Sequence, residues 1–289
     1  YHNLISLLRP YETKPEKIRI GSKYDGGYIL PQPILLDADC LISFGVSTNI
    51  DFENQFNDIN SSASINMFDP FIGVREDLKR LVIRLFKGTP PVVRKIDLKP
   101  NSEYTQKSSP LIRDTFLRFL HWLKFYSFVA KTNVKYRKRG IRNYVDDQFI
   151  DFKTLFADND VKTKKSIILK IDIEGDEYNT FNDMLPFLEN VSTILYEFHD
   201  IKNNHEHLIN IIKELKSKGF YLIHIHGNNT DELVPKTSIP NTLELSNCKE
   251  EYCDINKPDE SRYPIKNLDF PCNPFMEDYQ LEFLNRKPC

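Results

Sequence analysis

The sequence predicts an α/β fold built on a sheet of mostly parallel strands. Short apolar runs at 40–44, 63–68, 167–171, 192–198 and 220–226 have the length and composition of buried strands. Segments with apolar residues at helical spacing separate most of them, and such alternation is typical of a parallel sheet covered on both faces. The 289 residues, 40% hydrophobic and 28% charged, suit one large domain or one domain with additions.

The stretch 167–178 is the centre of this prediction. Its apolar half, Ile167 to Ile171, is followed by four carboxylates in six positions, at 172, 174, 176 and 177. Burying unpaired charge is costly, so these groups belong where the strand leaves the core and a helix begins. Ligands of open α/β sheets bind at the carboxyl ends of strands. The stretch is therefore interpreted as the floor of an active site.

The N-terminal part supplies a helix, a hairpin and a first strand–turn–helix unit. Residues 1–16 contain a short amphipathic helix that Pro10 ends. Two apolar pieces between 18 and 30 flank Asp25-Gly26-Gly27, which fits a hairpin turn or a turn where backbone approaches a ligand. The strand at 40–44 leads through a turn with Gly45 and Ser47 into a helix at 50–59. That turn lacks G-x-G-x-x-G, so an NAD-binding fingerprint is not matched.

The second strand, 63–68, ends in Asp69-Pro70. A carboxylate at this place can accept hydrogen bonds from both hydroxyls of a ribose, although an Asp before Pro also fits a simple turn. A helix at 74–87 and a third strand within 89–98 are expected next.

A basic, aromatic segment follows and is interpreted as a helical insertion at about 100–147. Its helix, 111–129, is dense in aromatic residues. From Arg113 to Arg142 the sequence contains nine Lys or Arg residues and only one acidic residue, Asp114. Such a segment can bind an acceptor, RNA or a membrane surface. It can equally pack its aromatic side chains on the core and leave its charges in water.

The C-terminal half continues the alternation. A strand or turn is expected at 149–156, and a helix after Gly175. The next strand, 192–198, ends in Glu197 and His199. These two side chains point to the same side, because alternate residues of a strand share a face. A helix closed by Gly219, a strand ending near His226 and a short strand at 242–245 follow. The expected division is a domain at 1–247 and a Cys- and Pro-rich tail at 248–289 packed on it. The polar strand ends that should converge are Gly45, Asp69, Asp172, Glu197, His199 and His226.

Composition narrows the functional classes. A net charge of −2 gives no overall attraction to nucleic acid, and no apolar run approaches the roughly 18 residues of a membrane span. The first residue is Tyr1, so we expect a fragment or processed form, located in the cytoplasm or, if an upstream anchor was removed, in the secretory lumen. Cys248, Cys253 and Cys272 fit ordinary thiols, a disulfide or a metal staple.

Five motifs, in the same order along residues 18–200, resemble those of FkbM-like S-adenosylmethionine-dependent methyltransferases. They are Arg19-Ile20-Gly21 with Asp25-Gly26-Gly27-Tyr28, Ser43-Phe44-Gly45 with Asp51-Phe52-Glu53, Phe68-Asp69-Pro70, Lys170-Ile171-Asp172-Ile173-Glu174-Gly175-Asp176-Glu177 and Glu197-Phe198-His199. The turn after Gly45 departs from the family pattern, because it lacks the usual second glycine.

The resemblance implies a Rossmann-like class I methyltransferase sheet of about seven strands. Gly45 would lie under the methionine part of the cofactor, Asp69 would hold the ribose and the strand end at 170–175 would lie near the methyl group. It implies O-methylation of a sugar, glycan or nucleotide-sugar. The cofactor contacts it implies are Lys23, Asp25, Gly26, Gly27, Gly45, Ser47, Glu53, Asp69, Pro70, Asp172 and Glu174.

Methyl transfer to a hydroxyl needs the acceptor oxygen about 3 Å from the methyl group and removal of its proton. His199 is the first candidate base, oriented by Asp172 or Glu197, and His226 is the second. Alternatively Asp172, Glu197 and His199 hold Mg or Mn, which lowers the pKa of the hydroxyl. Two other functions stay open: methylation of RNA or protein through the basic segment, and a non-catalytic module with the same fold.

Overall fold

The computed structural model describes residues 1–72 and 110–285, with the side chains of 110–119 and 285 excepted. The helix expected at 74–87, the strand expected within 89–98, the first residues of the expected insertion and Cys289 lie outside the described residues.

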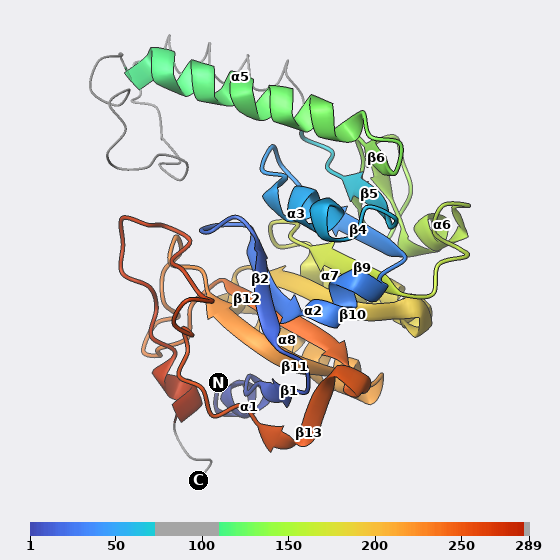
Figure 1. The fold of residues 1–289 in the computed structure, drawn as a ribbon. Coiled ribbons are helices and arrows are strands. Elements are labelled where there is room, and N and C mark those ends of the chain that lie inside the picture. The colour runs from blue at the N-terminus through green and yellow to red at the C-terminus, as the bar shows by residue number, and fades with distance from the viewer. Residues whose placement is uncertain (73–109, 286–289) are drawn as a thin grey trace.

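A seven-stranded sheet forms the centre of the molecule, in the order β11-β12-β10-β9-β4-β5-β6 (Figure 1). Strands β6, β5, β4, β9 and β10 are parallel, and β12 runs antiparallel to both β10 and β11. The predicted mostly parallel sheet is confirmed. Its strands are β4 (Cys40–Phe44), β5 (Ser64–Phe68), β6 (Val134–Arg137), β9 (Ile167–Ile171), β10 (Val191–Phe198), β11 (Phe220–Gly227) and β12 (Leu243–Lys249).

The strand order reverses between β4 and β9. The chain builds β4, β5 and β6 outward to one edge and then returns to place β9 on the other side of β4. In open α/β sheets a crevice forms at such a switch point, outside the carboxyl ends of the strands. The stretch predicted as an active-site floor begins there, directly after β9.

Helices cover both faces of the sheet because alternate strand residues point to opposite sides. Ile42 and Phe44 belong to the core under α1, α6, α7 and α8, whereas Leu41 belongs to the core under the β2–β3 hairpin, α2, α3 and α5. The helices are α1 (His2–Leu7), α2 (Gln32–Asp37), α3 (Asp51–Ile59), α5 (Pro110–Val129), α6 (Phe152–Ala157), α7 (Glu177–Met184) and α8 (Ile201–Ser217). None of the described helices is both long and apolar enough to cross a bilayer.

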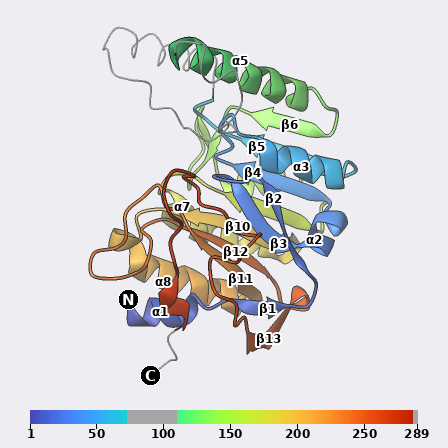
Figure 2. The ribbon, with the colours of Figure 1, turned by 60° about the vertical axis from the view of Figure 1, so that its left-hand side comes forward.

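The last part of the segment expected as an insertion contributes a strand to the sheet. Helix α5 leads into β6, which pairs in parallel with β5. The strand beside β5 is therefore Val134–Arg137, in the stretch that the sequence analysis assigned to the insertion. Helix α5 lies beside β6 at this edge of the sheet (Figure 2). Its Trp122, Phe125 and Phe128 are buried in the core on this face. The expectation that the aromatic side chains pack on the core is confirmed for them.

Smaller elements complete the chain. The expected hairpin is confirmed as β2 (Lys17–Gly21) and β3 (Gly27–Pro31). Residues 149–156, expected as a strand or turn, form β8 (Phe149–Ile150), paired with β7 (Gly140–Ile141), and the start of α6. Helix α2 was not predicted; it is short, and its proline stands in the first turn, where proline is tolerated. The 3₁₀ segments are Leu185–Asn190, Glu250–Tyr252 and Glu282–Asn285.

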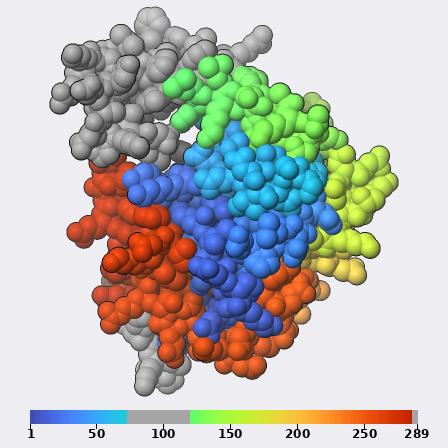
Figure 3. Space-filling model, viewed as in Figure 1, coloured from blue at the N-terminus to red at the C-terminus, as the bar shows by residue number. Residues whose placement is uncertain are grey.

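The last part of the chain returns to the N-terminal part. Strand β13 (Cys253–Pro258) pairs antiparallel with β1 (Tyr11–Thr13), and Lys17 Nζ lies 2.7 Å from Asp259 Oδ2. Figure 3 shows the red C-terminal segment lying directly against the blue N-terminal one on this face of the molecule.

Candidate active site

A pocket of about 570 Å³ lies at the carboxyl ends of the central strands. Asp69 and Asp172, which follow β5 and β9, both line it, so the separate strand ends do meet in one cavity. The predicted site residues in its wall are Asp25, Gly45, Ser47, Asp69, Pro70, Asp172, Glu174, Glu197 and His199.

Gly45 allows the turn after β4 to touch the end of β9. Its φ is +71°, and a Cβ atom there would lie 1.5 Å from the backbone oxygen of Asp172. A larger residue is excluded by that backbone atom as well as by the left-handed conformation. The one glycine of this turn is thus required for the pocket's shape.

Asp69 holds the loops that surround it. Its Oδ1 accepts hydrogen bonds from the backbone N–H groups of Phe71 (2.7 Å) and Ile72 (3.0 Å), and Oδ2 accepts one from Ser47 (2.9 Å). A carboxylate has about four acceptor positions, so about one remains, on Oδ2. Asp69 in this conformation can accept one ribose hydroxyl, not the expected pair.

Glu177 organises the acidic turn after β9. This fully buried side chain accepts hydrogen bonds at Oε1 from the N–H groups of Ile173 (3.0 Å) and Gly175 (3.2 Å). The same oxygen lies 3.1 Å from His199 Nδ1. Glu177 therefore fixes both the turn and the ring that faces the pocket. The sequence analysis named it among the four carboxylates but gave it no role.

His199 lies among carboxylates on its other side too. Its Nε2 is 3.7 Å from Glu197 Oε1, 3.8 Å from Glu174 Oε2 and 4.0 Å from Asp172 Oδ1. Burial lowers the pKa of His199, but the hydrogen bond and charge of Glu177, with Asp172 and Glu174, outweigh it and raise that pKa to about 9. The ring is an imidazolium at neutral pH, which makes it a poor proton acceptor.

Asp172 has the opposite property. Burial raises the pKa of Asp172 to about 7, although Lys170 and His199 act to lower it. Burial, followed by the charges of Asp172 and Glu244, also raises the pKa of Glu197 well above its usual value. A group with a pKa near 7 is well suited to accept a proton at neutral pH. Of the two candidate bases, Asp172 therefore has the pKa better suited to accept a proton.

The predicted metal ligands are only partly brought together. The donor atoms of Asp172, Glu177 and His199 lie within 4.8 Å of one another, whereas Glu197 groups with Asp25 and Glu244. Either set could hold a divalent ion by composition, with oxygen-rich ligands that favour Mg or Mn.

Five expected site residues lie away from the pocket wall. Glu53 is fully buried in α3, where it accepts the Ser43 hydroxyl hydrogen bond (2.5 Å) and lies 3.9 Å from Lys170 Nζ. Lys23 is exposed, with Nζ over the ring of Phe270. Gly26 and Gly27 form the tight hairpin connection, where a Cβ on Gly27 would lie 2.1 Å from Ser22 O.

His226 is the fifth. It is buried, with Nδ1 2.8 Å from Glu244 Oε2 and Nε2 3.1 Å from Asp278. Its place is taken in the pocket wall by Asn228, two residues further on, whose side chain donates to Glu197 Oε1 (2.7 Å). The sequence signal for Asn228 was its position just after the strand end.

The rest of the wall comes from residues that the sequence analysis did not select. Arg142 lines the pocket and pairs with Asp176 at 2.9 Å. Phe71, Ile141 and Phe149 give the wall an apolar side. Its remaining residues are Phe44, Gly140, Ile173, Thr230, Asp231 and Thr242.

Comparison with known proteins gives one family match. Residues 99–222 match the methyltransferase FkbM domain. No functionally curated protein matches the sequence.

Several solved structures are distantly similar. They include the fibrillarin/Nop5p complex (9% identity, 73% of each chain, TM-score 0.35). A precorrin-6y C5,15-methyltransferase from Geobacter metallireducens shares 8% identity over 76% of this chain and 88% of the other (TM-score 0.33). A Streptococcus pneumoniae protein assigned as a tRNA (m1A22) methyltransferase, in complex with S-adenosyl-L-methionine, shares 9% identity over 75% and 71% (TM-score 0.32).

The matched residues include α5, β6, β9 and β10, together with Asp172, Glu174, Asp176 and Glu197 of the pocket wall. The expected resemblance is confirmed: this chain has the class I methyltransferase fold, contains a methyltransferase FkbM domain and is an S-adenosylmethionine-dependent methyltransferase.

Proposed function

We propose that the chain transfers the methyl group of S-adenosylmethionine to a hydroxyl of a neutral sugar or glycan. The acidity of the pocket carries this proposal. Seven wall residues are Asp or Glu, namely Asp25, Asp69, Asp172, Glu174, Asp176, Glu197 and Asp231, against Arg142 and His199 as cations. Carboxylates accept hydrogen bonds from sugar hydroxyls but repel phosphate groups.

The pocket suits the cofactor in size and chemistry. Its volume of about 570 Å³ lies within the usual range of small-molecule sites, about 300–1,000 Å³. The free acceptor position of Asp69 can take a ribose hydroxyl, and the apolar side formed by Phe71, Ile141 and Phe149 can cover an adenine ring. When bound, the cofactor supplies a methyl group on a positively charged sulfur, a charge that the surrounding carboxylates favour.

Proton removal falls to Asp172 in this proposal. The carboxylate, ionised in about half of the molecules near pH 7, accepts the hydroxyl proton as the acceptor oxygen attacks. The His199 imidazolium beside it favours the charged form of Asp172 and is held in place by Glu177. Methyl transfer converts the hydroxyl to an ether, and the proton that it loses stays on Asp172 until solvent takes it.

An RNA acceptor fits these residues less well. Of the basic segment, Arg137 pairs with Asp158 at 2.9 Å and Lys135 pairs with Asp160, while Arg142 pairs with Asp176. Cations that are already paired within the chain contribute less to phosphate binding.

The test is release of S-adenosylhomocysteine from purified protein given S-adenosylmethionine and separate panels of neutral sugars, nucleotide-sugars, RNA and protein. We expect turnover with neutral sugars or glycans, unchanged by EDTA. Loss of turnover with EDTA that Mg²⁺ or Mn²⁺ restores would indicate a catalytic metal at Asp172 and His199 in place of the general base. Turnover with RNA or protein alone would refute the sugar proposal, and no binding of S-adenosylmethionine by calorimetry would favour a non-catalytic module.

A further inference from the structure

A row of buried ionisable side chains crosses the sheet behind the pocket. Glu197 of β10 lies directly opposite Glu244 of β12, and Glu244 lies directly opposite His226 of β11. All three are at most 4% exposed. Two like charges opposite each other in a sheet are destabilising, and burial increases the cost. Within the described residues, the ion pairs of the two carboxylates are with histidines: Glu197 with His199 and Glu244 with His226.

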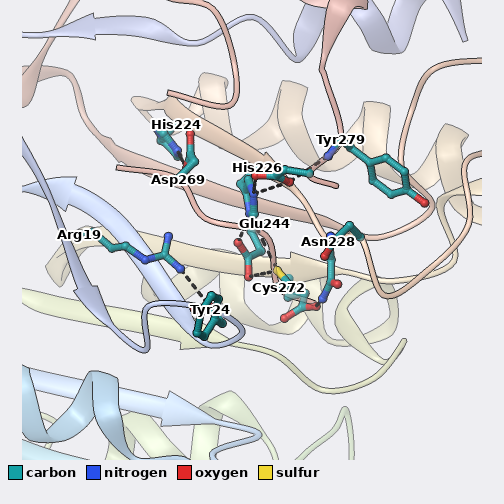
Figure 4. Close-up of polar contacts among 12 residues, drawn as sticks. Arg19, Tyr24, His224, His226, Asn228, Glu244, Asp269, Cys272 and Tyr279 are labelled. Atoms are coloured by element: carbon teal, nitrogen blue, oxygen red, sulfur yellow. Dashed lines mark hydrogen bonds and ion pairs between the residues drawn. The ribbon is translucent and has the colours of Figure 1, made fainter. Parts of the chain in front are cut away.

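Cys272, in the C-terminal segment, lies next to Glu244 and His226 of this row. Its fully buried Sγ lies 3.7 Å from Glu244 Oε1 and 4.0 Å from His226 Nδ1, and these two side chains are 2.8 Å apart at Oε2 and Nδ1. Figure 4 shows the three side chains facing one another. In a tetrahedral zinc site, bonds of about 2.0–2.3 Å keep ligand atoms about 3.2–3.7 Å apart. Movements of a few tenths of an ångström would bring this set to that geometry.

The second nitrogen of His226 has the partner that a metal ligand requires. Its Nε2 lies 3.1 Å from both oxygens of Asp278. Metal-binding histidines usually donate their other N–H to a carboxylate, which orients the ring and increases its basicity. Asp278 therefore leaves Nδ1 as the nitrogen available to an ion.

We propose that His226, Glu244 and Cys272 bind one zinc ion that fastens the C-terminal segment to the sheet. A thiolate beside an imidazole and a carboxylate favours zinc over Mg, Ca or Mn. Glu197 can supply the fourth ligand, because its carboxylate lies within 4.8 Å of that of Glu244. Binding displaces the proton between His226 and Glu244 and the thiol proton of Cys272, and both pass to solvent. The zinc site adjoins the pocket of the proposed methyl transfer through Glu197, and its test uses neither cofactor nor acceptor.

The experiment measures metal in the whole chain. Protein from zinc-supplied cells is expected to keep about one zinc per chain through gel filtration. After chelation, Co²⁺ should restore a near-ultraviolet sulfur-to-cobalt band. Cys272→Ser should lose that band and most of the zinc. Cys40→Ser is the matched control: Cys40 is also fully buried, but its sulfur lies near Asn66 and away from this row.

Asp278→Asn keeps all three donors and should weaken zinc binding by about 10–100-fold. This variant still tests the zinc site if Cys272→Ser fails to fold. Less than about a tenth of an equivalent of zinc in the original protein with no cobalt band, or equal zinc in a folded Cys272→Ser variant, would overturn the proposal.

Discussion

Replacing Asp172 with asparagine is the sharpest test of the proposed proton transfer. The amide keeps the shape of the side chain but cannot accept the hydroxyl proton. A positioned general base contributes about 10²–10⁴-fold to a rate, so Asp172→Asn should lower kcat by at least about 100-fold. Asp58→Asn, an exposed change on α3, provides the matched control and should leave kcat unchanged.

The pH dependence carries the same test further. Since the pKa of Asp172 is raised to about 7, the ionised base and therefore the rate should increase with pH through about 7 and level off above it. Residual activity of Asp172→Asn should lack this rise. The measurement is the rate of S-adenosylhomocysteine release from pH 5.5 to 9 at saturating cofactor.

His199→Gln distinguishes the two candidate bases. If the His199 imidazolium supports Asp172, the variant keeps turnover and the midpoint of the pH profile moves upward, because the charge of His199 lowers the pKa of Asp172. If His199 is the base, its replacement removes turnover and the pH profile together. An Asp172→Asn variant within about threefold of the original rate would refute the assignment of Asp172.

Two further predictions concern stability. Gly45→Ala should lower the free energy of unfolding by more than about 3 kcal/mol, because the new Cβ would collide with the backbone oxygen of Asp172. Gly175→Ala, with φ +108° but no atom within 4 Å of the new Cβ, should lower it by only about 1–3 kcal/mol through backbone strain. Urea unfolding of the two variants measures the difference, and equal losses would contradict the steric argument. For Asp259, burial raises the pKa, but Lys17 and Ser261 outweigh it and lower that pKa to about 2. The group therefore adds about 2–3 kcal/mol above pH 4 that is lost as pH falls through about 2, and the stability deficit of Asp259→Asn should shrink over that range in urea titrations.

The buried strands were predictable because burial on both faces demands apolar runs of fixed length. Strand β6 was not, because Val134–Arg137 lies at the edge of the sheet and only Val134 is buried. Edge strands commonly carry charge, and here the alternation of Lys135 and Arg137 resembled a solvated charge run. Those cations meet Asp160 and Asp158, far along the chain, which no local pattern indicates.

The sequence predicted which strand ends form the site, but it did not predict the direction in which each side chain points. Asp172, Glu197 and His199 line the pocket as expected, since each follows or ends a strand at the same edge. Glu53 also fits the family pattern, but α3 turns it toward Ser43 and Lys170 inside the fold. His199 looked like a base from its residue type alone. Its pKa depends on Glu177, which reaches it only through the fold of the turn after β9.

Glu244 is a residue whose unusual place was visible in the sequence, although the groups that interact with it were not. It stands between Leu243 and Leu245 in a short apolar strand, and a carboxylate in such a place needs a compensating group. That group cannot be identified locally, because register alone sets Glu244 between Glu197 and His226 and the chain returns 28 residues later to add Cys272. A charged residue within a buried strand therefore marks a site whose composition only the sheet order reveals. Here the order joins one side of the methyltransferase pocket, through Glu197, to a cluster with the donors of a metal site.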